Sequence, residues 1–311
     1  MMNWQKNILS SIGETPLVEL QRLGREFGCR IFGKVESLNP SGSIKARTAL
    51  KMIEDAEAQN LLKPESIIVE ATSGNQGIAL AMIGAVKGYK VKIVMPENMS
   101  LERRKLIQAY GAEVVLAPAG ANIQEAIEGS VSIMNRLAEE DANVFLPRQF
   151  ENLNNPLAHR EGTGYEIITQ LDGIKVDAFV SGFGTGGTIT GVGEALRKVY
   201  PALRIFAAEP DQAAILSGLP MGHHNQQGIG DGLIPPIMNV DLVDELILVS
   251  DAQAEETARQ LARQEGLISG VSSGTNIYSA LEIAKKLGPG HTIVTLLPDS
   301  GERYLSAGLY E

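Results

Sequence analysis

Strand-like apolar runs alternate with amphipathic helical stretches along this chain of 311 residues. The runs expected to form strands are 67–71, 91–95, 113–116, 177–181, 204–208, 245–249 and 291–297. The stretches with helical spacing are 78–87, 101–110, 123–137, 252–265 and 276–287. This alternation predicts an α/β fold with parallel sheets covered by helices on both faces. Ligands of such sheets bind beyond the carboxyl ends of the strands, where turns lead into helices.

The pattern forms two blocks, which we interpret as two domains. Residues 46–153 are expected to form a smaller α/β domain, and residues 1–45 and 154–311 a larger one. No linker or change of composition marks the boundary, so the division depends on the pattern alone. Within the larger block, residues 217–236 are rich in Gly, His, Asn and Gln and predict a long loop, a kind of segment that is often functional.

Charge and composition exclude several classes of partner. The formal net charge is −10 and there is no run rich in Lys and Arg, which argues against nucleic acid as a partner. No apolar run reaches membrane-spanning length, so we expect a soluble, cytoplasmic protein. The single cysteine, Cys29, lies at the edge of an apolar strand and cannot form an internal disulfide. His223 and His224 are interpreted as loop residues and His159 as structural, so no metal site is predicted.

Lys45 is the first candidate for chemistry. It follows a turn rich in Pro, Ser and Gly in the segment Asn39–Arg47, and it begins a helical pattern. A lysine that is partly desolvated beside the positive end of a helix has a lowered pKa and suits Schiff-base formation. Taken alone, an ordinary helix start with a solvated lysine is the simpler interpretation.

A glycine-rich turn after the strand 67–71 is the second candidate. Thr72, Ser73, Asn75 and Gln76 lie in it, directly before a helix. Their side chains and the helix N-terminus together form a site for an anion such as a carboxylate or a phosphate. An ordinary helix cap would explain one Ser or Thr but not the whole cluster.

A second turn of this kind, residues 180–191, follows another strand. Its small residues let backbone N–H groups converge on a phosphate, with the hydroxyls of Thr185 and Thr188 in reach. The glycine spacing differs from a dinucleotide fingerprint, although Glu209 lies near the distance at which an acidic residue would be needed. One phosphate monoester fits this turn best. A third turn, Gly270–Asn276, is equally well explained as a simple helix cap.

These segments fit one bound molecule, pyridoxal phosphate (PLP). Its aldehyde would bond to Lys45 and its phosphate would lie in the turn 184–188, while the turn 72–76 would take a substrate carboxylate. A dinucleotide-dependent dehydrogenase is the competing enzyme class, and a protein-docking scaffold without activity is a third.

Further segments resemble a known family over nearly the whole chain. They are Gly13–Leu17, Lys34–Ser37, Met95–Arg104, Gln149–Phe150 with Asn155–Pro156, and Pro298–Leu305. With the three turns, they resemble the cysteine synthase (O-acetylserine sulfhydrylase) and cystathionine β-synthase family of fold-type-II PLP enzymes. The resemblance implies two α/β domains of the tryptophan synthase β type, with PLP in the cleft between them, and a homodimer.

The resemblance also implies roles for individual residues. Lys45 would hold PLP, Asn75 would hydrogen-bond its ring hydroxyl, and Ser272 would face its pyridine nitrogen. The phosphate would be bound by Gly184, Thr185, Gly186, Gly187 and Thr188. The substrate carboxylate would be bound by Thr72, Ser73, Asn75 and Gln149.

The implied reaction is β-replacement on a β-substituted L-alanine through α-aminoacrylate, with Lys45 moving the α-proton. Cysteine synthase, which converts O-acetyl-L-serine and sulfide to L-cysteine and acetate, is favoured. The alternatives are a sulfide-producing L-cysteine lyase or hydrolase, which forms serine or a thioether, and cystathionine β-synthase. The expected small-molecule partners are therefore an amino acid and sulfide or a thiol.

Three positions depart from the common forms of the family, and one of them, Ala46 in place of a frequent Asp, varies within the family and carries no inference. Gln76 stands where Thr is usual, and its longer amide is expected to hold the substrate carboxylate or nucleophile differently. Asp231 stands where a small residue such as Ala is usual. It is either a loop aspartate that accepts backbone hydrogen bonds or a catalytic base for water or another nucleophile, and the sequence leaves both open.

Overall fold

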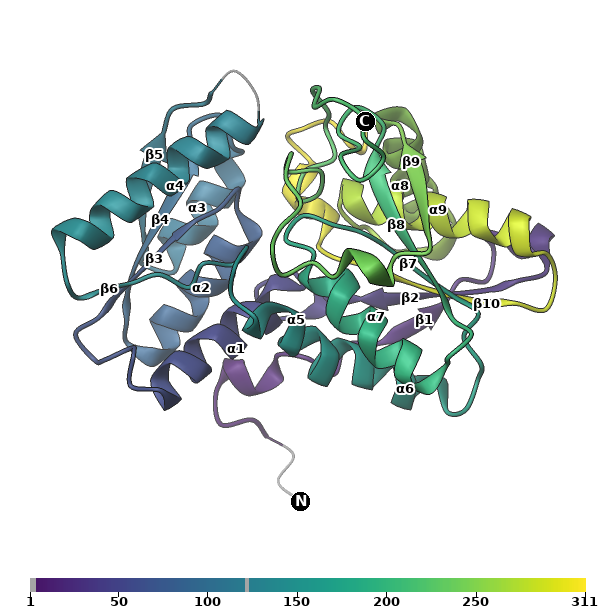
Figure 1. Cartoon of the computed structure of the whole chain (residues 1–311), viewed down its shortest axis with the longest axis horizontal. Coiled ribbons are helices and arrows are strands. Elements are labelled where there is room, and N and C mark those ends of the chain that lie inside the picture. Colours follow the sequence, from purple (N-terminus) through teal and green to yellow (C-terminus); the bar gives the residue numbers. More distant parts are fainter. Residues whose placement is uncertain (1–3, 121–122) are drawn as a thin grey trace. The chain divides into compact units, whose positions relative to one another are not determined.

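The computed structural model of the protein describes residues 4–120 and 123–311 and divides into two compact units (Figure 1). The first unit comprises the residues up to Gly13 together with Asn39–Asn155, and the second comprises Glu14–Leu38 with Pro156–Glu311. These bounds differ from the expected 46–153, since Leu9 packs into the core of the first unit. Residues 1–3 and 121–122, which fall within the expected domains, lie outside the described residues.

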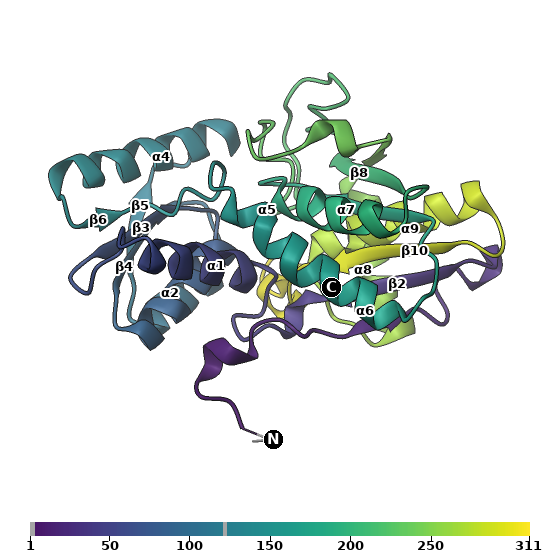
Figure 2. The same ribbon diagram turned by 60° about the horizontal axis from the view of Figure 1, so that its bottom comes forward.

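A parallel sheet with the strand order β5-β4-β3-β6 forms the centre of the first unit. The strands are β3 (Ile67–Ala71), β4 (Lys90–Pro96), β5 (Glu113–Ala117) and β6 (Val144–Phe145). The helices are α1 (Lys45–Ala58), α2 (Asn75–Lys87), α3 (Leu101–Ala109) and α4 (Ile123–Glu140). Because side chains alternate along a strand, Ile68 packs with α1 to α3 and Val69 with α4, so helices cover both faces (Figure 2).

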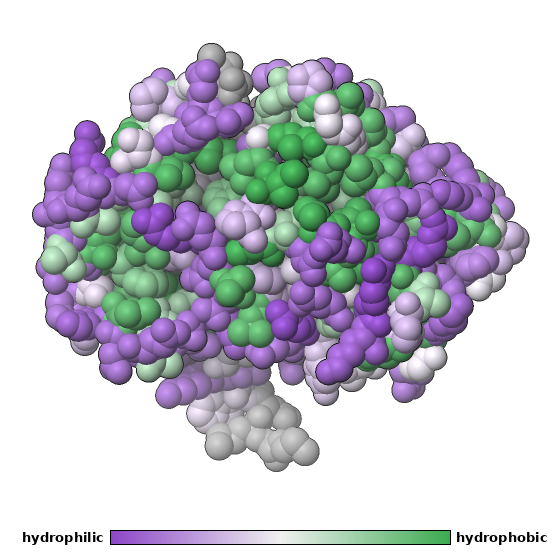
Figure 3. Space-filling model, in the orientation of Figure 1, coloured by the Kyte–Doolittle hydropathy of each residue, from purple (hydrophilic) through white to green (hydrophobic). Residues whose placement is uncertain are grey.

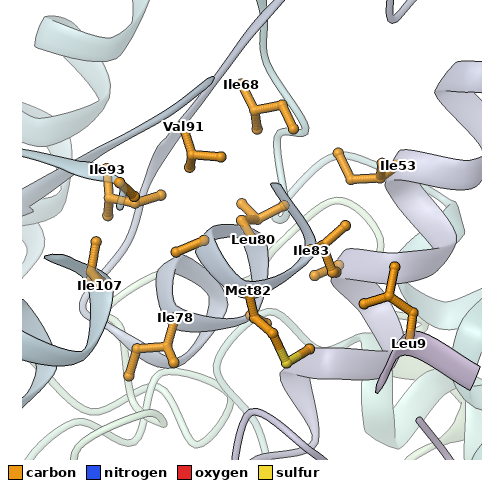
Figure 4. Packing of buried hydrophobic residues seen from close by; sticks show 14 of the residues in the cluster. Leu9, Ile53, Ile68, Ile78, Leu80, Met82, Ile83, Val91, Ile93 and Ile107 are labelled. Carbon is orange, nitrogen blue, oxygen red and sulfur yellow. The ribbon is translucent and has the colours of Figure 1, made fainter. Parts of the chain in front are cut away.

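Helix α2 is buried over most of its length, and its buried side chains lie on every side of the helix. Figure 4 shows Ile78, Leu80, Met82 and Ile83 of α2 pointing in different directions, toward the strands and toward α1, α3 and the N-terminal segment. A helix that is hydrophobic all round is a buried one. The N-terminus of α2, which carries the turn 72–76, is therefore fixed in the core of its unit.

The second unit contains a six-stranded sheet with the order β1-β2-β10-β7-β8-β9. The strands are β1 (Leu17–Glu19), β2 (Arg30–Val35), β7 (Ala178–Gly182), β8 (Arg204–Pro210), β9 (Glu245–Val249) and β10 (Thr292–Leu297). Only the pairing of β1 with β2 is antiparallel. The helices are α6 (Tyr165–Leu171), α7 (Gly187–Val199), α8 (Asp251–Glu265) and α9 (Val271–Leu287), and a π-helix, η4 (His159–Gly164), follows α5 (Asn154–Ala158).

Neighbouring residues of β8 show that helices cover both faces of this sheet as well. Phe206 belongs to the cluster that α8 and α9 complete. Ile205, on the opposite face, lies against Gly193 of α7. Figure 3 shows one face of the molecule, on which apolar patches lie among polar side chains.

The α/β fold with parallel sheets predicted from the sequence is confirmed, and each expected strand and helix is present. The structure also contains elements that were not expected, among them β1, β6 and α6, and two helices start earlier than expected. Helix α2 begins at Asn75 rather than at residue 78, and α9 begins at Val271 rather than at residue 276. Within the described residues, no helix combines the length and hydrophobicity needed to span a bilayer.

Candidate active site

Lys45 is the first residue of α1 and is half-buried. The turn before it has a fixed shape, because the Gly42 N–H donates to the Asn39 carbonyl at 2.6 Å and the Asn39 side chain accepts from the Gly13 N–H at 2.9 Å. The hydroxyl of Ser43, two residues before the lysine, is buried without a hydrogen-bond partner among the described residues. A buried polar group of this kind is typical of a site that takes a polar ligand.

The turn 72–76 contains one position, Gly74, whose backbone conformation favours glycine. Gly74 has φ +151°, and its N–H donates to the Thr72 hydroxyl at 3.2 Å. A Cβ on Gly74 would overlap the side chain of Arg103, a buried residue of α3. Ser73 is half-buried in the turn, and Asn75 is the first residue of α2. Sequence reasoning missed Arg103, although it falls within the quoted segment Met95–Arg104.

Gln149 lies beside this turn. The resemblance implies that both bind the substrate carboxylate. The side-chain amide of Gln149 donates to the Ala71 carbonyl at 3.3 Å, and its backbone carbonyl accepts from the side-chain amide of Asn155 at 2.8 Å. Its N–H donates to the carboxyl of Glu70 at 3.2 Å. Burial raises the pKa of Glu70 to about 8, although hydrogen bonds from the backbone of Gln149 and Ala71 act in the opposite direction.

The side chain of Gln76 does not follow its prediction, because it points into the helix layer. It is 1% exposed, and its amide oxygen accepts from the Thr48 hydroxyl at 3.0 Å. Its amide nitrogen lies 3.6 Å from the sulfur of Met52, and Thr48 lies 3.1 Å from the Lys45 carbonyl. The amide thus ties the start of α2 to the first turn of α1, and it is not presented to a substrate.

In the second unit, the turn 184–188 connects β7 to α7. Gly186 has φ +75°, and a Cβ there would overlap Met238. A Cβ on Gly184 would lie 2.7 Å from the Gly228 carbonyl and 2.8 Å from the Asp231 carboxylate. Gly187 begins α7, so first-turn N–H groups without intrahelical partners lie here. A turn of close-packed glycines before a helix fits a bound phosphate.

Asp231 therefore lies directly against the turn 184–188. It is 9% exposed, and its loop is joined to the turn by a hydrogen bond from the Gly230 N–H to the Phe183 carbonyl at 3.1 Å. His224 is a loop residue, as expected, and its Nε2 donates to the carbonyl of Gly230 at 3.0 Å, so it supports this loop.

Ser272 occupies the second position of α9 and is buried. The start of α9 is fixed to two strand ends by Asn276. This side chain accepts from the Gly182 N–H at 2.7 Å, at the end of β7, and donates to the Leu296 carbonyl at 2.8 Å, in β10. Ser272 and the turn 184–188 thus belong to the same edge of the same sheet.

His159, which the sequence assigned a structural role, contacts a predicted phosphate ligand. Its Nε2 lies 3.1 Å from the hydroxyl of Thr188 and its Nδ1 lies 3.0 Å from the hydroxyl of Thr163. Among the described residues, no group of three or more His, Cys, Asp and Glu side chains is arranged to hold a metal ion.

Comparison with known proteins places these features in context. The family model described as pyridoxal-phosphate dependent enzyme matches residues 8–299. A cysteine synthase from Staphylococcus aureus is 47% identical over 304 residues, which is 98% of this chain and 96% of that protein.

Two solved structures are similar along their whole lengths. An O-ureido-L-serine synthase superposes with a TM-score of 0.94 at 44% identity, covering 99% of this chain and 95% of that one. A hydrogen sulfide-producing enzyme from Fusobacterium nucleatum has a TM-score of 0.92 at 41% identity, covering 97% and 100%.

Proposed function

The chain belongs to the pyridoxal-phosphate dependent enzyme family, and we propose that it is a cysteine synthase, which forms L-cysteine and acetate from O-acetyl-L-serine and sulfide. The observation that carries this proposal is the 47% identity to a cysteine synthase along 98% of the chain. The expectations of a homodimer and of a cytoplasmic location stay predictions.

Within each unit, taken by itself, the residues fit one part of PLP. We assign the cofactor carbonyl to Lys45, the ring hydroxyl to Asn75, the pyridine nitrogen to Ser272 and the phosphate to the turn 184–188. The buried Ser43 hydroxyl before Lys45 and the glycine turn before α7 support this assignment. When bound, PLP supplies a carbonyl that links to amines and a ring that accepts electrons from the substrate.

The protein's own groups then bind the substrate and move its proton. Thr72, Ser73, Asn75 and Gln149 bind the substrate carboxylate at the N-terminus of α2, where the helix dipole favours an anion. With PLP bound and the substrate's own amine in place of Lys45 at the cofactor carbonyl, the freed Lys45 amine would take the proton from the α-carbon, and acetate would leave from Cβ. After the nucleophile has added at Cβ, Lys45 would return a proton to the α-carbon. Because a serine hydroxyl carries no charge, Ser272 leaves the ring a weaker electron acceptor, which favours elimination over transamination.

The position of the Asp231 carboxylate supports the alternative reaction, which is the release of sulfide from L-cysteine. This carboxylate lies against the turn that we assign to the phosphate, where it would repel hydrosulfide and could take a proton from water. Such a residue would favour the release of sulfide from cysteine, and one similar structure is described as a hydrogen sulfide-producing enzyme.

Two assays on the PLP-loaded protein distinguish the reactions. We expect O-acetyl-L-serine and sulfide to give L-cysteine, with the variant Lys45→Ala inactive and Asp231→Asn little changed. Sulfide release from L-cysteine is the second assay. The proposal fails if the protein releases sulfide from L-cysteine faster than it makes L-cysteine. If Asp231→Asn also abolishes that release, Asp231 is a catalytic residue of the sulfide-producing reaction.

A further inference from the structure

A fully buried histidine joins the predicted phosphate turn to a neighbouring helix. His159 and Thr163 are both 0% exposed, and they face each other across one turn of the π-helix η4. The other ring nitrogen of His159 lies 3.1 Å from the hydroxyl of Thr188, which is half-buried at the start of α7. The three side chains thus form one line, Thr163, His159 and Thr188.

The close approach that makes this line possible depends on two glycines. A Cβ on Gly191 of α7 would overlap the carbonyl of Pro156 and lie 2.8 Å from the Cβ of His159. A Cβ on Gly164 of η4 would lie 2.6 Å from the Cβ of Ala195 in α7. Helices η4 and α7 therefore pack nearly backbone to backbone. Single turns of π-helix occur mostly inside α-helices and frequently at functional sites.

Counting hydrogens shows what the histidine does to Thr188. A threonine hydroxyl has one hydrogen to donate, and a neutral imidazole carries a hydrogen on only one of its nitrogens. If Nε2 lacks a hydrogen, Thr188 must donate to it and can offer a bound anion only lone pairs. If Nε2 carries the hydrogen, Thr188 accepts it and its own hydrogen is left for the anion, while the Thr163 hydroxyl donates to Nδ1.

We propose that His159 and Thr163 are positioning residues that make Thr188 a hydrogen-bond donor to the cofactor phosphate. In this arrangement the Nε2–H of His159 donates to the Thr188 hydroxyl, and the Thr163 hydroxyl donates to Nδ1. This inference rests on the proposed function, since it assigns the phosphate of PLP to the turn 184–188.

The test compares two aldehydes that differ only in the phosphate. The full-length protein, stripped of cofactor, is titrated with PLP and with pyridoxal. We expect His159→Leu to lower the affinity for PLP about tenfold or more, because one hydrogen bond to a charged group is lost. The affinity for pyridoxal should change little. Thr163→Val should act in the same direction. His159→Gln, whose amide can donate in place of Nε2–H, should restore much of the affinity.

Thr169→Val is the matched control, because Thr169 is exposed and its hydroxyl donates to the Tyr165 carbonyl within its own helix, α6. If His159→Leu lowers the affinity for PLP and for pyridoxal equally, His159 has only a structural role and the inference is overturned. If the unmodified protein binds PLP no better than pyridoxal, the phosphate assignment and with it the proposed function fail. If it prefers PLP and every variant keeps that preference, only the role of His159 is overturned.

A spectroscopic measurement on the unmodified holoenzyme covers the case in which the variants do not fold. Nitrogen NMR of His159 should show a hydrogen on Nε2. A ring that carries its hydrogen on Nδ1 alone contradicts the proposal.

Discussion

Glu70 is a residue whose charge state is altered by the fold. It is 2% exposed at the end of β3, and its carboxyl accepts from the Gln149 N–H. Burial raises its pKa to about 8, so the carboxyl stays protonated at neutral pH in the folded protein. In the unfolded chain the same group ionises near the ordinary value of 4.5. The stability that the neutral form contributes is therefore fully present below 4.5 and is lost as the pH rises to about 8.

We expect the variant Glu70→Gln to remove this pH dependence, because a glutamine can accept the same hydrogen bond and does not ionise. The free energy of unfolding of the variant minus that of the parent should grow between pH 4.5 and 8, by at most about 5 kcal/mol. Urea unfolding at several pH values measures the difference.

Glu54→Gln is the control for that experiment, since Glu54 is exposed on α1. Its unfolding free energy relative to the parent should be nearly constant over the same range. If the unfolding free energy of Glu70→Gln minus that of the parent is also constant over this pH range, Glu70 ionises normally in the folded protein.

At the scale of elements, two helical glycines have opposite roles. Gly191 lets α7 approach η4, and a Cβ there would overlap the Pro156 carbonyl. Gly129, in the middle of α4, has nothing within 4 Å of the place where a Cβ would lie. We expect Gly191→Ala to destabilise the protein by about 2 kcal/mol or more through overpacking. Gly129→Ala should stabilise it by about 0.5–1 kcal/mol.

Thermal or denaturant unfolding of both variants checks this prediction, and each serves as the control for the other. Equal effects would mean that helix propensity, and not the packing of α7 on η4, decides the result. Gly191→Ala should also weaken PLP more than pyridoxal if the displaced helix moves His159 away from Thr188.

Most elements could be predicted because their hydrophobic patterns are strong. The buried strands β3, β7 and β10 are mostly apolar, and α8 has a clear polar and apolar face with a capping box at Ser250. The sequence predicts the start of α2 too late, because Asn75, Gln76 and Gly77 are polar or small and show no helical periodicity. The two-residue strand β6 is too short to have a pattern.

The parts of the site that sequence reasoning missed depend on tertiary packing. Gln76 could be seen as unusual, but the partner of its amide, Thr48, is on another helix. His159 meets Thr188 because a glycine in each helix, Gly164 and Gly191, lets η4 and α7 approach closely. Single-sequence patterns report which face of an element is buried, and they do not report which residue lies opposite.

For the whole molecule, the expected homodimer is open to a direct test. Large apolar side chains such as Ile234 and Leu248 are 45% and 41% exposed in the second unit, and Figure 3 shows apolar patches on one face. We expect sedimentation equilibrium to give twice the mass of the chain at micromolar concentration. A mass equal to one chain at all concentrations would contradict the prediction.

The position of β10 has a consequence for how the protein is made. This last strand lies between β2, near the N-terminus, and β7, so both have one open edge until residue 297 has been synthesised. On the ribosome, the first unit has all its residues once Asn155 has emerged. The β1–β2 hairpin must wait through nearly the entire remaining translation with an unpaired strand edge, a state that favours aggregation and recruits chaperones. Nascent chains that stop short of β10 should therefore be the ones most dependent on such protection.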